Sequence, residues 1–225
     1  MERFFDIFFS GLALVALSPL LIPIVIVLKC SGEGEIFFLQ KRVGKDGKVF
    51  ELLKFATMLK DSPNLGTGTV TMRDDPRVLP VGKFLRKTKI NELPQLLNIF
   101  FGSMSIIGPR PLHSQTFSSY SNATQKIITT LRPGLSGIGS IIFRGEEDIM
   151  HGETASVDFY DKVIAPYKGL LEEWFVVNRG LYIYFLSIGV TVWVIIFAKS
   201  SIPWRVFKDL PEPPEELKSV LNYAS

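Results

Sequence analysis

The stretch KINELPQLLNIFFGSMSIIGPRP, residues 89–111, joins two apolar bursts to acidic, amide and basic side chains. Its apolar residues, together with one just upstream, recur at roughly helical spacing, at Leu85, Leu93, Leu96, Leu97 and Phe100. Pro94 suits the first turn of a helix, where its missing N–H is not needed. The stretch therefore predicts a helical segment that begins with polar residues and ends in a Gly-Pro-Arg-Pro turn.

Polar residues near both ends of this stretch call for an interpretation. Asn91 is an N-cap candidate, and Glu92 is an acid in the first turn of the following helix, where the helix dipole favours negative charge. At the other end, prolines on both sides of Arg110 restrict its backbone, so its guanidinium group can make a forked contact to a phosphate. The alternative for Arg110 is an exposed side chain in a surface turn.

The composition favours one main domain and argues against nucleic acid as a ligand. A chain of 225 residues suffices for one core together with membrane-associated segments. Its 25 basic and 22 acidic residues leave a net charge of +3, too small for the concentrated basic face of a nucleic-acid binder. Basic residues cluster at 40–48 and 82–89, where they suit phosphates or anionic lipid headgroups, or form a solvated basic face.

The scarcity of cysteine and histidine limits the chemistry. With Cys30, His113 and His151 as the only such residues, the chain can form neither an intrachain disulfide nor a metal site rich in thiolates or histidines. Any metal must be a hard ion on carboxylates and phosphates, such as Mg²⁺ or Mn²⁺. The sequence also contains no P-loop, no dinucleotide-binding GxGxxG fingerprint and no GxSxG nucleophile elbow.

Residues 7–28 form an apolar run of 22 residues without a charge, which as a helix of about 33 Å matches the hydrocarbon thickness of a bilayer. The run is longer than the apolar region of a usual signal peptide. Ser18-Pro19 and Pro23 predict a kink, because proline removes a backbone donor and clashes with the preceding turn. The residues leave both a full span and a re-entrant helix open.

A second uncharged run covers residues 180–198. With 19 residues it is marginal for a span, so an interfacial helix and a buried core helix are equally compatible with it. The Pro-rich segment LPEPPEEL, residues 210–217, predicts an extended and exposed end of the chain.

Between the two apolar runs, residues 30–179 alternate short apolar bursts with Gly and Pro. Residues 35–58 predict two short strands joined by a tight turn at Asp46-Gly47, a dipeptide that tolerates positive φ. Residues 60–78 are rich in turn formers and predict a loop, the kind of segment that often carries site residues.

Taken together, these motifs resemble one family, the bacterial sugar transferases or monotopic polyprenyl-phosphate phosphoglycosyl transferases, in its small type. The resemblance covers residues 2 to about 145 in the family's order, and its specificity comes from the combination of motifs. The matching segments are ERFFDIFFSGLALVALSPLL at 2–21, FFLQKRVGKDGKVFELLKFATM at 37–58, DDPRVLPVGKFLRKTKINELPQLLNIFFGSMSIIGPRPL at 74–112 and LRPGLSGIGSIIFR at 131–144.

The resemblance implies an α+β fold that is mainly helical. Residues 1–30 would form a re-entrant membrane helix hairpin, broken at Ser18 and Pro19. Residues 31–179 would form a small cytoplasmic catalytic domain with short strands and amphipathic interfacial helices. An apolar membrane-associated or interfacial helix at 180–199 and a Pro-rich tail at 200–225 would follow.

The resemblance also implies an activity and its partners. Family members act at the cytoplasmic face of the bacterial inner membrane, among membrane lipids. They move a sugar phosphate from a UDP-sugar to undecaprenyl phosphate and release UMP, which initiates assembly of a lipid-linked polysaccharide or glycoprotein glycan. The sequence does not specify the sugar, and it leaves homo-oligomerisation open.

Site residues are implied by the same resemblance. Family members use an Asp-Glu pair in which the aspartate attacks the donor phosphorus and the glutamate helps to hold Mg²⁺. Glu92 matches that glutamate, as a catalytic residue and metal ligand. Arg86 and the turn Pro109-Arg110-Pro111 match the residues that bind phosphate and nucleotide. Asp75 and Arg77 are expected to support this site. Less specific matches place Gln40, Arg42 and Lys54 near the membrane-facing cleft, although exposed strand charges account for them equally well. Phe143 and Arg144 match positions beside the sugar pocket.

Asn91 departs from the family's pattern, because it occupies the position of the nucleophilic aspartate. A carboxamide is a very poor nucleophile and a weaker ligand for a hard cation than a carboxylate. The chain could belong to a subgroup in which Glu92 or direct attack by the carrier phosphate replaces the aspartate, it could bind without turnover, or the asparagine could be an engineered change. A catalytically impaired nucleotide-sugar or polyprenyl-phosphate binding protein is therefore the alternative function, and a membrane scaffold is a third.

Overall fold

The computed structural model describes residues 1–62, 75–144 and 157–223, and the chain divides into two compact units. The first unit contains residues 1–4, 42–50 and 102–225, and the second contains residues 5–41 and 51–101. The fold is mainly helical with short strands, as predicted. The predicted loop at 60–78 lies largely outside the described residues.

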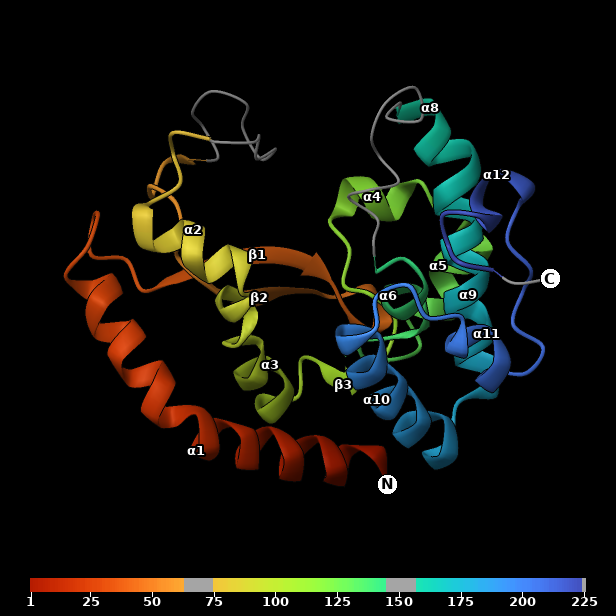
Figure 1. Cartoon of the computed structure of the whole chain (residues 1–225), viewed down its shortest axis with the longest axis horizontal. Helices are drawn as coiled ribbons and strands as arrows, with labels where there is room; N and C mark the ends of the chain where they lie inside the picture. The colour runs from red at the N-terminus through yellow and green to blue at the C-terminus, as the bar shows by residue number, and fades with distance from the viewer. Residues whose placement is uncertain (63–74, 145–156, 224–225) are drawn as a thin grey trace. The chain divides into compact units, whose positions relative to one another are not determined.

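The N-terminal apolar run forms α1 (Glu2–Lys29), a helix long and apolar enough to cross a membrane. It bends part-way along its length, as Figure 1 shows, and it contains Pro19 and Pro23. Near the first proline, the Ser18 hydroxyl donates a hydrogen bond to the Val15 carbonyl at 2.7 Å. The predicted kink is confirmed. The backbone remains helical throughout, and the re-entrant hairpin stays a prediction.

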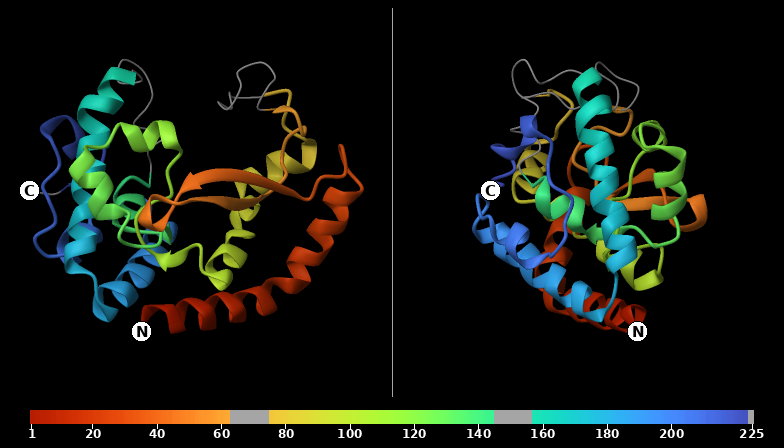
Figure 2. Two further views of the ribbon diagram at one scale, coloured as in Figure 1. Left: turned by 180° about the vertical axis from the view of Figure 1, so that it is seen from behind. Right: turned by 90° about the vertical axis from the view of Figure 1, so that its right-hand side faces the viewer.

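The predicted strands form the hairpin β1 (Phe37–Val43) and β2 (Val49–Phe55), which lie side by side in Figure 2. At the turn, Asp46 has φ 57° and Gly47 has φ 71°. Asp-Gly is favoured here because both residues tolerate the left-handed region. At the same turn, the Asp46 N–H donates a hydrogen bond to the Thr129 carbonyl at 2.7 Å. The hairpin prediction is confirmed.

The predicted helical segment around residues 85–100 is divided into three pieces: α2 (Pro80–Lys87), the 3-10 helix η3 (Ile90–Glu92) and α3 (Gln95–Phe101). The core of the second unit contains Leu28, Phe55 and Leu85, so the end of α1 packs against β2 and α2. Gly82 allows α2 to approach the backbone just after β2 closely, because a Cβ there would lie 2.2 Å from the Thr57 carbonyl oxygen.

In the first unit, β3 (Ser105–Ile107) pairs in parallel with β4 (Gly134–Ser136). The register places Ser105 opposite Gly134 and Ile107 opposite Ser136. Because parallel strands end at the same edge, the Gly-Pro-Arg-Pro turn after β3 and the Gly-rich turn after β4 emerge together. Along the chain, α4 (Ser114–Ser118) and α5 (Asn122–Ile128) lie between β3 and β4, and α6 (Ile138–Ile142) follows β4.

The helices that follow form the rest of the first unit. They are α8 (Val157–Phe159), the π-helix η5 (Tyr160–Ile164), α9 (Ala165–Asn178), α10 (Leu181–Ile196), α11 (Ile202–Val206) and α12 (Glu215–Lys218). α9 packs on α5 and α6. The expectation of an exposed, extended end holds only in part. Residues 210–214 form neither helix nor strand and Glu212 is exposed, but Leu217 is buried, and the Tyr167 hydroxyl donates to the Pro211 carbonyl at 2.7 Å.

The second apolar run forms α10, which packs on α6, β3 and β4 through one face. That face buries Tyr184, Ser187, Val190 and Val194. Several of its other side chains are exposed and apolar, namely Tyr182, Phe185, Val192, Trp193, Ile195 and Ile196. α10 is thus part of the core on one side and presents exposed apolar side chains on the other.

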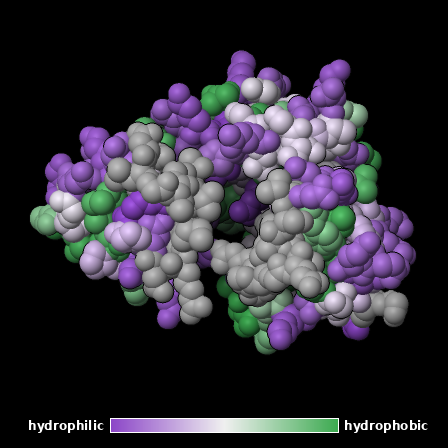
Figure 3. All heavy atoms as spheres, turned by 90° about the horizontal axis from the view of Figure 1, so that it is seen from above, coloured by the Kyte–Doolittle hydropathy of each residue, from purple (hydrophilic) through white to green (hydrophobic). Residues whose placement is uncertain are grey.

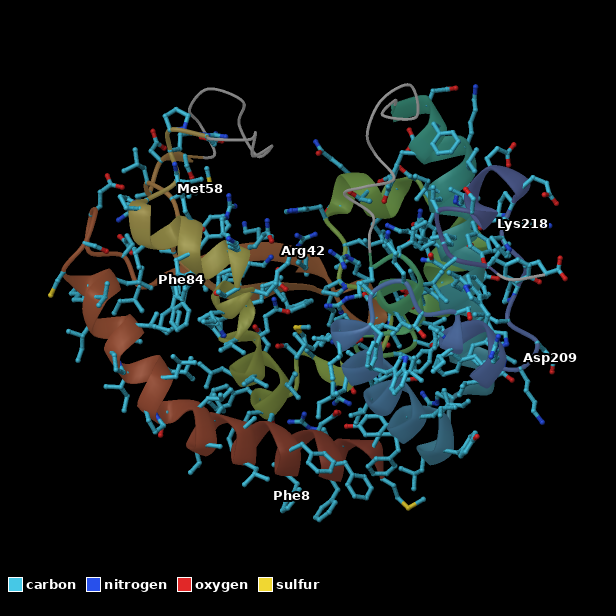
Figure 4. The ribbon with its side chains drawn as sticks, in the orientation of Figure 1. Phe8, Arg42, Met58, Phe84, Asp209 and Lys218 are labelled. Atoms are coloured by element: carbon cyan, nitrogen blue, oxygen red, sulfur yellow. The ribbon has the colours of Figure 1, made fainter. Side chains whose placement is uncertain are left out.

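Exposed apolar side chains are also numerous on α1, where Phe8 is 53% exposed and points outward from the helix in Figure 4. Elsewhere the surface is different, because hydrophilic residues predominate among those coloured in Figure 3. The exposed apolar residues are therefore not spread evenly, and single helices carry much of them.

Candidate active site

Asn91 and Glu92 lie in η3, between α2 and α3. The chain enters η3 through Lys89, whose φ of 58° is in the left-handed region. A non-glycine residue adopts this conformation at a cost, so the surroundings hold the turn in place. The Glu92 carboxylate accepts a hydrogen bond from Lys54 Nζ on β2 at 3.0 Å. With 39% of its side chain exposed, Glu92 is tied to the hairpin and yet open to solvent.

Asn91 is buried, and its Oδ1 atom has no hydrogen-bond partner in the part of the chain that the structure describes. The N-cap interpretation is therefore wrong, since a capping oxygen would accept a backbone N–H. A buried oxygen left unpaired costs about 1–3 kcal/mol, so stability does not account for Asn91. What the residue does offer is a carbonyl oxygen next in sequence to a carboxylate, two ligand types that suit a hard cation.

Asn98 on α3 ties the helix that follows η3 to β2 of the hairpin, a role that the sequence did not indicate. Its Oδ1 accepts the backbone N–H of Leu53 at 2.9 Å, and its Nδ2 donates to the Glu51 carbonyl at 2.8 Å. Both bonds go to the segment of β2 that carries Lys54. An asparagine inside an apolar helical pattern was the available signal, because such a side chain needs a partner when buried.

Asp75 and Arg77 form a buried, two-pronged ion pair ahead of α2. Arg77 Nε donates to Asp75 Oδ1 at 2.9 Å and Nη2 donates to Oδ2 at 2.6 Å. Arg77 Nη1 also donates to the Ser62 carbonyl at 2.6 Å. The carboxylate raises the pKa of Arg77, chiefly through these hydrogen bonds. The guanidinium group of Arg77 is directed at Asp75, and it holds the chain segment that leads into α2. A direct contact between Arg77 and a phosphate stays a prediction.

Arg86 lies half-buried on α2. Burial lowers the pKa of its guanidinium group; the charge of Asp75 opposes this effect and that of Arg77 adds to it. The structure thus brings Arg86 together with the ion pair that precedes its helix. A cation that has lost part of its hydration is a stronger partner for a phosphate than one in bulk water.

The Pro109-Arg110-Pro111 turn lies in the first unit, directly after β3. The Gly108 N–H donates to the Ser136 carbonyl at 2.9 Å, and the Gly134 N–H donates to the Pro109 carbonyl at 2.8 Å. Pro109 is buried, whereas Arg110 is exposed. The turn is therefore anchored through its backbone and presents its guanidinium group outward.

A pocket opens beside this turn. Its walls include Pro109, Arg110, Phe117, Thr129 and Pro133, together with residues at the end of β1. The lining is mostly apolar with a cation at its edge.

Glu172 on α9 is the other residue that sequence reasoning missed. It is 2% exposed, and its Oε1 accepts the backbone N–H of Arg110 at 3.3 Å. Burial raises the pKa of Glu172 to about 7, while the bond to Arg110 and the charges of Arg110 and Lys168 oppose this rise. The signal was an acid in the apolar segment LLEEWFVV, residues 170–177.

Phe143, matched to a sugar pocket in the sequence, is 4% exposed. Lys168 Nζ lies 4.8 Å from the centre of its ring, and the ring of Tyr167 lies 6.0 Å away. These contacts explain Phe143 as a core side chain, and its place beside a sugar stays a prediction.

The predicted site residues thus fall into two groups. Asp75, Arg77, Arg86, Asn91 and Glu92 belong to the second unit, and Pro109, Arg110 and Pro111 belong to the first. Within the described ranges, no group of three or more His, Cys, Asp or Glu side chains is arranged to hold a metal ion.

The model of the bacterial sugar transferase family matches residues 1–168. The chain belongs to this family. A relative from Sinorhizobium fredii, exopolysaccharide production protein ExoY, is 37% identical to this sugar transferase over 171 residues, which cover 70% of this chain and 74% of the relative. The UDP-glucose:undecaprenyl-phosphate glucose-1-phosphate transferase of Escherichia coli is 36% identical over 162 residues, or 71% of this chain and 35% of that protein.

A third relative of this sugar transferase is the galactosyl transferase CpsE of Streptococcus agalactiae, 32% identical over 183 residues, which cover 77% of this chain and 38% of the relative. The matched region contains both groups of predicted site residues. Glu172 lies beyond its last residue, so the family match gives no indication of the contact to Arg110.

Proposed function

We propose that this sugar transferase moves a sugar 1-phosphate from a UDP-sugar to undecaprenyl phosphate and releases UMP. The observation that carries the proposal is the η3 turn, where Glu92 is held by Lys54 beside the buried amide of Asn91. Support also comes from relatives whose names include undecaprenyl-phosphate glucose-1-phosphate transferase. The reaction would initiate assembly of a lipid-linked glycan, such as an exopolysaccharide.

The charges of the reactants explain the cationic residues. A pyrophosphate donor and a phosphate acceptor repel one another, so the reaction needs positive charge where they meet. Arg86 supplies a partly desolvated guanidinium group, and Arg110 supplies an exposed one beside a pocket. Arg110 would contact the nucleotide, and Arg86 would contact a phosphate.

Magnesium fits the oxygen atoms of the η3 turn. Glu92 offers a carboxylate and Asn91 an unpaired carbonyl oxygen, and Mg²⁺ is usually held by one or two such groups together with substrate phosphates. When bound, the ion would neutralise developing charge on the phosphates. Lys54 holds Glu92 in place for this role.

The asparagine points to direct transfer. The carrier's phosphate oxygen would form a bond to the donor phosphorus that bears the sugar, and the bond from that phosphorus to the UMP oxygen would break, so UMP leaves with the bonding electrons. No covalent sugar-phosphate adduct on Asn91 is needed. Donor labelled in its sugar phosphate should therefore leave no label on acid-quenched protein, whereas a labelled protein would indicate a nucleophile such as Glu92.

The membrane location is part of the proposal. α1, with its exposed apolar side chains, would enter the cytoplasmic leaflet of the inner membrane and return at Ser18-Pro19, and the apolar face of α10 would lie in the interface. Cys30 is exposed at the end of α1 and is the only cysteine, so it reports on that end. In spheroplasts, an impermeant maleimide should label neither Cys30 nor the double variant Glu2→Cys/Cys30→Ser; labelling of one end would indicate a full span.

The activity itself is tested with a panel of UDP-sugars, vesicles that contain undecaprenyl phosphate, and Mg²⁺. UMP release that requires the carrier is expected with at least one sugar. No release across a broad panel, together with ligand-induced thermal stabilisation, would favour the second candidate, a protein that binds nucleotide sugar or polyprenyl phosphate without turnover. The observation that favours this candidate is the amide at position 91.

A further inference from the structure

The Glu172 carboxylate lies where two segments of the first unit approach α9. One is the Pro109-Arg110-Pro111 turn, whose Arg110 N–H donates to Oε1 at 3.3 Å. The other follows β4, where a Cβ added at Gly139 would lie 2.5 Å from Oε1 and one added at Gly137 would lie 3.8 Å from Oε2. The pairing of β3 with β4 brings these two segments together. Glu172 lies next to both of them, past the ends of the strands.

A packing role alone does not explain this acid. Glu172 is almost fully buried, and its Oε2 has no hydrogen-bond partner among the described residues. Burying an acid costs free energy that an apolar side chain of similar size would avoid. The charges near it, Arg110 and Lys168, are both positive, and the glycines facing it leave room for its oxygen atoms.

We propose that Glu172 is a positioning residue for nucleotide binding, which sets the Arg110 turn through the hydrogen bond from its backbone N–H. The inference rests on the proposed function, in which Arg110 contacts the nucleotide. The bond fixes the peptide that precedes the Arg110 side chain, between two prolines that already limit the backbone. Glu172 itself contacts neither substrate.

The same hydrogen bond predicts the effect of a substitution at Gly139. An alanine there would displace Oε1, because 2.5 Å is far below an ordinary contact distance. The carboxylate is the mobile end of a side chain, so it can rotate away, and the bond to Arg110 is what breaks. Gly139→Ala should therefore reproduce the effect of Glu172→Ala on the Arg110 turn.

The test measures KM for the UDP-sugar, KM for undecaprenyl phosphate and kcat in wild type and variants. Glu172→Ala should raise KM for the UDP-sugar by about 10-fold, the effect of one hydrogen bond, with kcat and the carrier's KM within about 2-fold. Glu172→Gln keeps an acceptor oxygen and should remain within about 3-fold of wild type. Glu173→Ala, the neighbouring half-buried acid on α9, is the matched control and should change neither KM.

The double variant Gly139→Ala/Glu172→Ala separates positioning from general damage. Its KM for the UDP-sugar should equal that of either single variant, because both remove the same bond. Multiplying effects, equal rises in both KM values, or an equal effect of Glu173→Ala would overturn the inference. If wild type releases no UMP, the proposed function fails, and calorimetric titration of the same variants with UMP decides the inference. Weaker binding by Glu172→Ala and Gly139→Ala, with Glu173→Ala unchanged, supports it; unchanged binding by Glu172→Ala overturns it.

Discussion

Asn91 and Glu172 are two buried polar side chains in different units, and they resolve the problem of burial in opposite ways. Asn91 is neutral, and its Oδ1 atom has no hydrogen-bond partner among the described residues. Glu172 retains an acid, with Arg110 and Lys168 as positive neighbours. Near η3, the ammonium group of Lys54 already bonds to Glu92. The difference is that the buried carboxyl faces two cations, whereas the buried side chain beside an engaged cation is a neutral amide.

The largest effect is expected at Glu92, on which the chemistry of the η3 turn depends. Glu92→Gln keeps the shape but removes the charge that would hold Mg²⁺, so kcat for UMP release should fall by about 100- to 1000-fold. Glu216→Gln, an exposed acid on α12, is the matched control and should leave kcat unchanged. Retained turnover in Glu92→Gln would move the chemistry away from η3.

The pKa of Glu172 gives the next largest effect, on stability. Burial raises the pKa of Glu172 in the folded state from its ordinary value of 4.5 to about 7, so the folded state binds the proton more tightly than the unfolded state. The stabilising contribution is complete below about pH 4.5 and is lost as the pH rises through about 7. Relative to Glu172→Gln, wild type should lose about 3 kcal/mol of unfolding free energy over this window. Urea titrations in detergent at several pH values measure it; a constant difference between the two proteins would contradict the buried acid.

Asn91→Asp tests the other half of the comparison. A carboxylate there would be buried while Lys54 bonds to Glu92, so the free energy of unfolding at neutral pH should fall by about 2 kcal/mol. Mg²⁺ should recover part of the loss in the variant and have a smaller effect on wild type. Thermal unfolding with and without Mg²⁺ measures both. A variant as stable as wild type without the ion would show that a cation already faces position 91.

The smallest effect is expected from Arg110→Lys, which keeps the charge and removes the fork. An ammonium group makes point contacts with phosphate, so KM for the UDP-sugar should rise by about 10-fold while the carrier's KM stays constant. Lys126→Arg, a conservative change on α5, is the control. A rise in the carrier's KM instead would assign Arg110 to the acceptor.

Particular residues explain which parts of the fold the sequence could predict. The hairpin was predictable because Asp46-Gly47 specifies its own backbone conformation. The division of residues 85–100 was not, because the left-handed conformation of Lys89 depends on its surroundings, and apolar spacing continues across it. The two faces of α10 were also unpredictable, since both are apolar and only tertiary packing distinguishes them.

The site was predictable in part for similar reasons. Glu92 and Arg110 lie in contiguous motifs, which a resemblance can carry. Glu172 acts on a residue 62 positions away and lies beyond the family match, so no local pattern connects the two. Asn98 likewise bonds to backbone more than 40 positions away, at Glu51 and Leu53. Contacts of this range become visible only in the folded chain.

The wild-type chain, which has Asn91 beside Glu92, should be an active transferase. The most direct measurement is UMP release by wild type and Asn91→Asp side by side, with the same UDP-sugar panel, undecaprenyl phosphate vesicles and Mg²⁺. Wild type should release UMP in a carrier-dependent manner without an aspartate at position 91. Release by Asn91→Asp alone, with none by wild type, would contradict it.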